Sequence, residues 1–222
     1  VAPKAQTAFS NMPVTAKVAL KDGRMRYSFR ASPIMSSYLL FLGIGDVERK
    51  TVMAGKTEIG IITRKGVADQ GDYALANAKR LLAYYNDYFG TPYPLPKLDM
   101  IAAPGSSQFF GAMENWGAIL YFEPTVLLDP KLETEAQKQD VFNMVAHEMA
   151  HQWFGDLVTM SWWDDLWLNE GFASWMASKA ADDLYPEWMQ LTQSLATARQ
   201  SAFSQDSLAT THPIIQRIVT VE

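Results

Sequence analysis

The sequence contains a His-Glu-x-x-His motif, in which His147 and His151 are four residues apart. On an α-helix this spacing places both imidazoles on one face, close enough to ligate a single metal ion. Glu148 follows the first histidine, where its carboxylate can reach a metal-bound water without ligating the metal. The motif therefore predicts a helix that carries two metal ligands, with Glu148 as the general base.

A third ligand is predicted at Glu170, which lies in the segment Leu-Asn-Glu-Gly on a second expected helix. Two histidines and one carboxylate leave one position of a tetrahedral zinc ion free for water, which is the arrangement of a catalytic site. A pair of satisfied core histidines is the alternative. It would place two imidazoles and a carboxylate on a buried helix at a large desolvation cost, which metal binding removes. We therefore expect one Zn²⁺ as the cofactor.

The residues around both segments favour helices. Positions 141–154 are apolar nearly all the way round, which is typical of a buried helix, and Gly155 is placed to end it. Small residues follow Glu170 at helical spacing and allow close approach to a neighbouring helix. We expect a third helix over 187–204, with Pro186 in its first turn.

Length and composition limit the classes of protein that remain. With 222 residues, of which 48% are hydrophobic, the chain can bury a sizeable core in one or two domains. The net charge of -5 and the lack of a basic run indicate neither nucleic acid nor an anionic membrane as a partner. The absence of cysteine excludes disulfides and thiolate ligands and leaves the compartment open. No apolar stretch is long enough to predict a membrane span.

Strand patterns dominate the first part of the chain. We expect strands from position 14 to about 54, including a hairpin around Asp22-Gly23. An alternating strand over 57–63, a helix over 72–90 and a short strand over 98–102 follow. Together with the later helices, this order predicts an α+β fold.

A second stretch of chemical interest runs from Phe109 to Gly117, where glycines bracket Glu114. The residue types alone favour a turn with a solvated Glu114. Glycine-bracketed backbone can also mark close approach to a ligand, and an edge strand beside a protease centre can bind an extended peptide by strand addition. The residues by themselves leave both interpretations open.

Three motifs follow one another along the chain. They are Gly-Ala-Met-Glu-Asn at 111–115, His-Glu-x-x-His followed by Gln-Trp-Phe-Gly at 147–155, and Trp-Leu-Asn-Glu-Gly at 167–171. In combination they resemble the zinc aminopeptidase family typified by aminopeptidase N, and the resemblance runs from about position 11 to the end of the chain. It implies a gluzincin metallopeptidase with a thermolysin-like catalytic domain over 55–222, a small mixed sheet followed by helices. The last strands of an N-terminal β domain would precede it over 1–54.

For the metal site, the resemblance implies that His147, His151 and Glu170 are the zinc ligands and Glu148 the general base. The zinc would lower the pKa of its water to about 7 and polarise the scissile carbonyl. Glu148 would take the proton of the water and pass it to the leaving amine. The implied activity is that of a zinc aminopeptidase, which removes the N-terminal residue from peptides.

For the substrate, the resemblance implies that Glu114 is the anchor of the free α-amino group. This reverses the interpretation of Glu114 as a solvated turn residue, which the residue types alone favour. A buried carboxylate facing an ammonium would restrict cleavage to the first residue of a chain. The other implied substrate-binding residues are Gly111, Ala112, Met113, Asn115 and Phe110. Gly111 and Ala112 would lie along the substrate backbone. Phe110 resembles the position that lines the pocket for the first side chain of the substrate, and a position in the hydrophobic core is an equal alternative for it.

The family also uses a tyrosine, well beyond the third ligand, to stabilise the tetrahedral intermediate. After Glu170 this chain has one tyrosine, Tyr185, which is expected at the end of the same helix and too near. The chain begins without Met or a signal peptide. We therefore expect a fragment that lacks this tyrosine, most of the N-terminal domain and the helical C-terminal domain. Losing one stabiliser of an oxyanion costs about a hundredfold to a thousandfold in rate.

Two functions of different classes follow from these expectations. The first is a zinc aminopeptidase acting on peptides with a free N-terminus. The second is a zinc-holding, peptide-binding fragment with little or no turnover. A related hydrolase of a lipid epoxide is a third variant, but members of that type carry glycine at the position of Ala112. The oligomeric state is left open.

Overall fold

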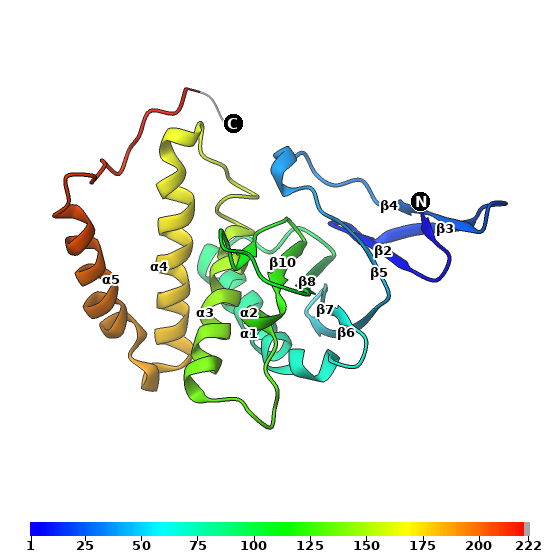
Figure 1. Cartoon of the computed structure of the whole chain (residues 1–222), viewed down its shortest axis with the longest axis horizontal. Helices are drawn as coiled ribbons and strands as arrows, with labels where there is room; N and C mark the ends of the chain where they lie inside the picture. Colours follow the sequence, from blue (N-terminus) through cyan, green and yellow to red (C-terminus); the bar gives the residue numbers. More distant parts are fainter. Residues whose placement is uncertain (220–222) are drawn as a thin grey trace.

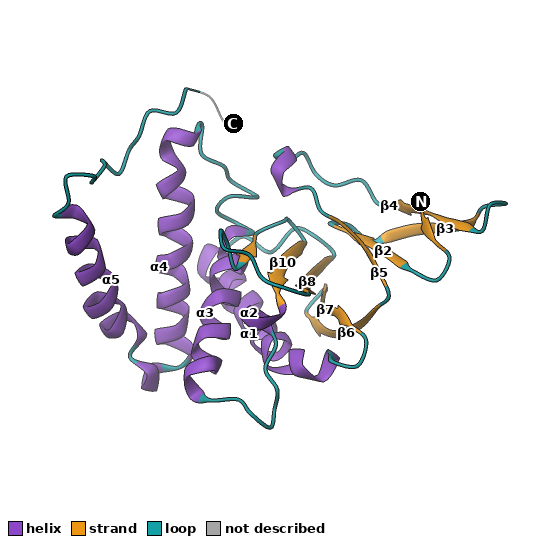
Figure 2. Cartoon of the chain, viewed as in Figure 1, coloured by secondary structure: helices purple, strands orange, loops and turns teal. Residues whose placement is uncertain are grey.

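The computed structural model describes residues 1–219, and residues 220–222, at the end of the expected peptidase domain, lie outside the described part. The chain folds as an α+β protein, with most strands preceding most helices (Figure 1). Figure 2 shows that the helices gather on one side of the molecule and the first strands on the other. The helices are α1 (Asp72–Phe89), α2 (Glu123–Val126), α3 (Glu135–His151), α4 (Leu166–Leu184) and α5 (Gln190–Asp206).

Two small sheets form at the N-terminal end, one in the order β1–β4–β3 and one pairing β2 with β5. The strands are β1 (Ala2–Pro3), β2 (Thr7–Ser10), β3 (Val14–Ala19), β4 (Arg24–Phe29) and β5 (Leu42–Gly45). The predicted hairpin is confirmed, because β3 and β4 pair antiparallel around Gly23, whose φ of 78° suits a residue without a Cβ. The apolar run expected as one strand is divided, since Ser37–Leu39 form a short 3₁₀ helix before β5.

A five-stranded mixed sheet, in the order β6–β7–β8–β10–β9, underlies the rest of the chain. Its strands are β6 (Val47–Ala54), β7 (Thr57–Arg64), β8 (Lys97–Ala103), β9 (Ala112–Met113) and β10 (Ala118–Phe122). The three central strands run parallel, and the two edge strands, β6 and β9, run antiparallel to their neighbours. β6 pairs with β7 along its whole length and so belongs to this sheet, although its residues fall within 1–54, the range expected for the N-terminal β domain.

One hydrophobic core joins the five-stranded sheet to α1, α3 and α4. Tyr85 of α1 is fully buried in it and donates from its hydroxyl to the carbonyl of Ala146 in α3 at 2.9 Å. α5 buries no residue along its length and lies on the outer side of α4 (Figure 1). Among residues 1–219, no helix combines the length and the hydrophobicity that crossing a bilayer requires.

Two helix ends differ from the prediction. α3 ends at His151 rather than at Gly155, because the next residues form a turn in which the amide of Asp156 donates to the carbonyl of His151. The third predicted helix begins at Gln190 rather than at Glu187, because Pro186–Trp188 form a short 3₁₀ helix first. These shifts leave His147 and His151 on α3 and Glu170 on α4.

Candidate metal centre

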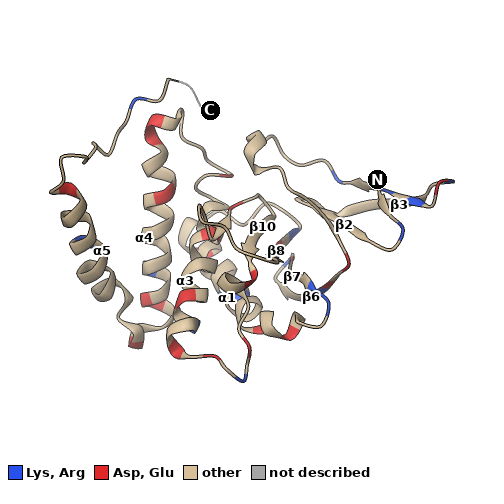
Figure 3. Ribbon diagram, viewed as in Figure 1, with Lys and Arg blue, Asp and Glu red and all other residues tan. Residues whose placement is uncertain are grey.

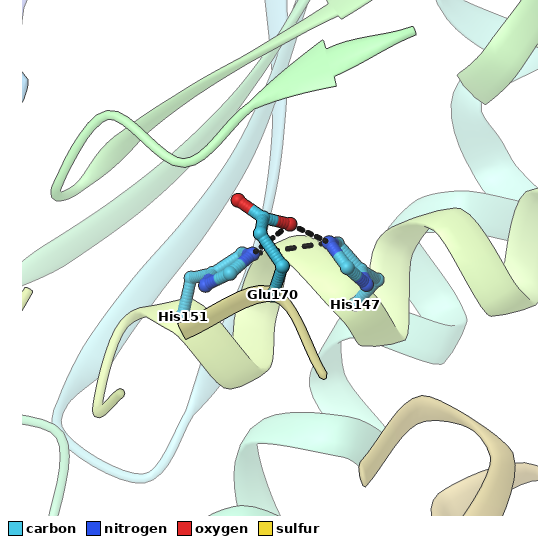
Figure 4. A group of neighbouring side chains, drawn as sticks. All are labelled: His147, His151 and Glu170. Carbon is cyan, nitrogen blue, oxygen red and sulfur yellow. Dashed lines mark hydrogen bonds and ion pairs between the residues drawn. The ribbon is translucent and has the colours of Figure 1, made fainter. Parts of the chain in front are cut away.

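The two histidines of the motif project together from the last turns of α3. Their Nε2 atoms lie 3.0 Å apart, as helical spacing predicts. α4 packs against α3 and brings Glu170 to the same place, with its Oε2 at 3.4 Å from His147 Nε2 and 3.7 Å from His151 Nε2 (Figure 4). Residues far apart in the sequence thus present two nitrogens and one oxygen to a single point.

These three donors fit a zinc ion. Zinc binds imidazole nitrogen and carboxylate oxygen at about 2.0–2.2 Å, which places tetrahedral ligand atoms about 3.3–3.6 Å apart. The separations of 3.0, 3.4 and 3.7 Å bracket that range. Three donors on one side leave a further position open toward solvent, since Glu170 is on an exposed part of α4.

The orientation of the His151 ring is set by two oxygen acceptors. Its Nδ1 lies 2.9 Å from Asn169 Oδ1 and 3.0 Å from the carbonyl oxygen of Phe154. Both partners accept hydrogen bonds, so Nδ1 carries the proton and Nε2 presents its lone pair to a metal. Ser174 Oγ lies 3.4 Å from His147 Nδ1 and is placed to orient the other ring. Sequence reasoning missed the roles of Asn169 and Ser174, for which the only signal was their position on the helix of the third ligand.

Glu148 lies on the buried side of the cluster and is 5% exposed. Burial raises the pKa of its carboxyl to about 8, with the nearby carboxylates of Glu114 and Glu170 adding to the rise and His151 opposing it. Its Oε2 has no hydrogen-bond partner among residues 1–219. A buried carboxyl with a pKa near neutrality is suited to accepting and returning a proton.

The electrostatics of the cluster favour a cation. Burial by itself lowers the pKa of His151, but Glu170 and the other carboxylates outweigh it and raise that pKa to about 9. Hydrogen bonds from His147 and His151 in turn hold the pKa of Glu170 well below its ordinary value. The surrounding carboxylates thus stabilise positive charge at the point where the donors meet.

Glu114 does not lie in a solvated turn, so that interpretation is wrong. It follows β9 directly and is 7% exposed. Its Oε1 accepts from Tyr38 Oη and from Asn169 Nδ2, both at 3.4 Å. Its carboxylate comes within 4.8 Å of ligand atoms of Glu148 and His151. A buried carboxylate therefore lies next to the group of His147, His151 and Glu170.

The backbone after Glu114 is held from two sides. Gln152 Nε2 donates to the Glu114 carbonyl at 3.0 Å, and its Oε1 accepts from the amide of Gly117 at 3.0 Å. Lys97 Nζ donates to the Gly117 carbonyl at 2.6 Å and pairs with Asp99 Oδ2 at 2.9 Å. Gly117 has a φ of 76° and its Cβ position is crowded by backbone, so only glycine fits there. The buried network fixes Glu114 relative to α3.

A cleft of about 840 Å³ runs over the cluster. It is lined by Phe109, Phe110, Gly111, Ala112, Met113, Glu114, Asp140, Asn143, Met144, His147, Glu148, His151, Glu170, Ser174, Ala177, Ser178 and Gln190. Phe110 is 47% exposed and rests on Phe122, so its alternative as a core residue is wrong. Asn115 is buried, does not line the cleft, and donates to the carbonyl of Leu39.

Another apolar cavity, of about 550 Å³, lies beside the start of α4 and is lined by tryptophans 162, 163 and 167. It contains none of the metal-cluster donors, so the candidate site is the larger cleft.

Comparisons with known proteins agree on one family. The model of the Peptidase family M1 domain matches residues 73–222. Aminopeptidase N of Acetobacter pasteurianus is 49% identical over 174 residues, which is 78% of this chain and 49% of that protein. Probable aminopeptidase 2 of Sulfurisphaera tokodaii is 46% identical over 213 residues, 96% of this chain and 27% of that protein. Aminopeptidase M1-B of Oryza sativa subsp. japonica is 45% identical over 214 residues, 96% of this chain and 24% of that protein. The chain thus spans from half to a quarter of the length of these relatives.

Proposed function

Because this chain belongs to peptidase family M1, we propose that it carries the catalytic site of a zinc-dependent aminopeptidase, which hydrolyses the N-terminal residue from peptides. The observation that carries this proposal is the meeting of His147, His151 and Glu170 at one point, with Glu148 buried beside them. The names of the relatives support the substrate class.

In this proposal His147, His151 and Glu170 hold the zinc. When bound, the zinc supplies a Lewis acid that polarises the substrate carbonyl and lowers the pKa of water to about 7. Glu148 accepts a proton from the attacking water and delivers it to the nitrogen of the leaving amine. The raised pKa of Glu148 suits a group that must hold this proton between the two transfers.

Glu114 binds the free α-amino group of the substrate in this proposal. Its carboxylate is buried and receives, from residues 1–219, two long hydrogen bonds at 3.4 Å, so it has acceptor capacity left for an ammonium. Gly111, Ala112 and Met113 lie along the same wall of the cleft, where β9 forms the edge of the sheet. An extended peptide could add to this edge, with its first side chain toward Phe110.

We also propose that the mixed sheet and the helices after it form a thermolysin-like peptidase domain, preceded by the end of a β domain. The order of a small mixed sheet followed by α3 and α4 supports this arrangement. The full pairing of β6 with β7 supports a boundary nearer to Val47 than to Ala54.

A second candidate function is peptide binding with little turnover. No tyrosine is among the residues that line the cleft in the part of the chain that the structure describes. Tyr185 stacks on Trp188 and donates to Asn77 of α1, away from the metal cluster. A site without a hydroxyl opposite the metal would lack one stabiliser of the developing oxyanion.

Hydrolysis of a leucyl or alanyl anilide by the zinc-loaded chain, compared with Glu148→Gln, separates the two candidates. The aminopeptidase predicts release of the aniline that falls at least about a hundredfold in Glu148→Gln, while bound zinc is unchanged. Zinc without turnover in either protein supports the binding function. Turnover that is equal in both proteins contradicts the role of Glu148.

A further inference from the structure

The cleft has an axis that runs parallel to α3. At one end the carbonyl of Glu114 accepts from Gln152, one residue beyond the end of the helix. At the other end Gly111 faces Met144, and a Cβ on this glycine would meet Met144 Cε at 3.1 Å. The wall from Gly111 to Glu114 therefore follows α3 from its middle to its C-terminal end, past the two histidines.

This axis gives a bound peptide a direction. If the amino group lies at Glu114, beside His151, the first carbonyl reaches the metal cluster. The remainder of the peptide must then continue past His147 toward Gly111 and the N-terminal half of α3. The residue of α3 that lines this far part of the cleft and carries a charge is Asp140.

Asp140 differs from the other carboxylates of the cleft in having no role in the proposed function. Its side chain is exposed, and it makes no hydrogen bond or ion pair with any residue in the described range 1–219. The proposed function employs Glu148 and Glu170 at the metal and Glu114 at the substrate amine. It does not use the carboxylate of Asp140.

The surroundings of Asp140 supply no positive charge of their own. Within the described part of the chain, neither lysine nor arginine lines the cleft, and the opposite wall consists of neutral side chains such as Ser178 and Gln190. The basic residues of the three long helices on this side are Lys138, which pairs with Glu133 and Glu135, Lys179 and Arg199. Figure 3 shows acidic positions spread over α3, α4 and their surroundings.

We propose that Asp140 makes this site selective for peptides with a lysine or arginine at the third or fourth residue. The inference rests on the proposed function, which places the amino end at Glu114. Asp140 lies about two turns before His147, or about 10 Å along the helix axis. An extended peptide covers that distance in about three residues. A long basic side chain there would reach Asp140, whereas an acidic one would be repelled.

The test uses hexapeptide amides that begin with Leu-Ala and carry Lys, Gln or Glu at the third or the fourth position, all other residues being alanine. Dissociation constants are measured by isothermal titration on zinc-loaded Glu148→Gln, so that binding is read without turnover. The same peptides are then compared by kcat/KM in the wild-type chain. Asp140→Asn is introduced into both proteins, and Asp87→Asn, which removes a carboxylate from α1 outside the cleft, is the matched control.

At low salt the lysine peptide of at least one series should bind about fivefold to twentyfold more tightly than its glutamate counterpart, because an exposed charge pair changes affinity by a few-fold in each direction. Asp140→Asn should abolish most of this preference, high salt should weaken it, and Asp87→Asn should leave it intact. Hydrolysis of a leucyl anilide, which is too short to reach Asp140, should be unchanged in Asp140→Asn.

Three outcomes would overturn the inference: no preference for the lysine peptides, a preference that is equal with and without Asp140, or no measurable binding of any peptide. The proposed function can fail separately. A lysine preference in binding without hydrolysis by the wild-type chain would refute the peptidase and leave the selectivity standing. Hydrolysis of the anilide without a preference for lysine would refute the selectivity and leave the peptidase function standing.

Discussion

Asn169 Oδ1 accepts a hydrogen bond from His151 Nδ1 at 2.9 Å, so a residue of α4 fixes the ring of a histidine in α3. The nitrogen of the same amide donates to Glu114 Oε1 at 3.4 Å. One buried side chain therefore orients both a proposed zinc ligand and the proposed anchor of the substrate amine.

Replacing this amide should weaken the metal site. We expect Asn169→Ala to lower zinc affinity about tenfold to a hundredfold, because partners that orient a ligating histidine contribute about this much. Competition with a chelator of known affinity measures the change. Ser174→Ala removes a longer contact, 3.4 Å from His147 Nδ1, and should have the smaller effect. Unchanged zinc affinity in Asn169→Ala would contradict the role assigned to it.

Gly155 should tolerate no side chain. A Cβ at this position would lie 2.5 Å from Asn169 Oδ1, and the φ of 128° is one that other residues rarely adopt. We expect Gly155→Ala to reduce the free energy of unfolding by at least about 1–3 kcal/mol, measured by urea denaturation. Gly171→Ala is the control, since it lies within α4 with no atom near its Cβ position. It should be neutral or stabilising by up to about 1 kcal/mol.

Asp156 should make stability depend on pH. Burial raises the pKa of its carboxyl well above 3.8, with Glu114 and Glu148 adding to the rise. The folded state therefore prefers the neutral carboxyl, and the stability from that preference is complete below pH 3.8 and is lost as pH rises toward the folded pKa. Asp156→Asn keeps a neutral group, so we expect it to be more stable than wild type by at least about 1 kcal/mol at pH 8.

Urea denaturation of both proteins from pH 5 to pH 8 tests this expectation, and the advantage of Asp156→Asn should shrink toward acid. Asp183→Asn is a control with the opposite sign. A hydrogen bond from Tyr84, followed by one from Lys179, lowers the pKa of Asp183, so its ionised form stabilises the folded state at neutral pH. An advantage of Asp156→Asn that does not vary with pH would show that ionisation is not its cause.

Loss of the charge at Glu114 should impair recognition of the substrate amine. We expect Glu114→Gln to lower kcat/KM for a leucyl anilide by at least about a hundredfold, because a substrate ammonium would lose a buried charged partner. Zinc content should stay the same, since Glu114 is not among the three proposed ligands. A variant that hydrolyses the free-amine substrate as well as wild type would disprove the anchor.

Local patterns predicted the parts of the site that lie on single helices. The four-residue spacing of His147 and His151 determines that they share a face of α3, and the hairpin at Gly23 depends on a local turn. α3 ends three to four residues earlier than its apolar pattern suggested, because the following apolar residues, such as Trp153, are buried in a turn rather than a helix.

Such local patterns do not predict contacts between segments that are far apart in the sequence. The burial of Glu114 depends on Tyr38, Gln152 and Asn169, which approach it from three other segments. Its residue type and glycine neighbours indicated solvent exposure, and only the resemblance to a family suggested otherwise. The two-residue strand β9 is likewise too short to leave an alternating pattern.

The number of zinc ions bound per chain is the most direct test of the metal centre. Elemental analysis after metal-replete purification and gel filtration should give one zinc per wild-type chain and almost none in His147→Ala, since that variant loses one of three donors. A wild-type chain without zinc, or zinc that persists undiminished in His147→Ala, would contradict the assignment of the metal centre to His147, His151 and Glu170.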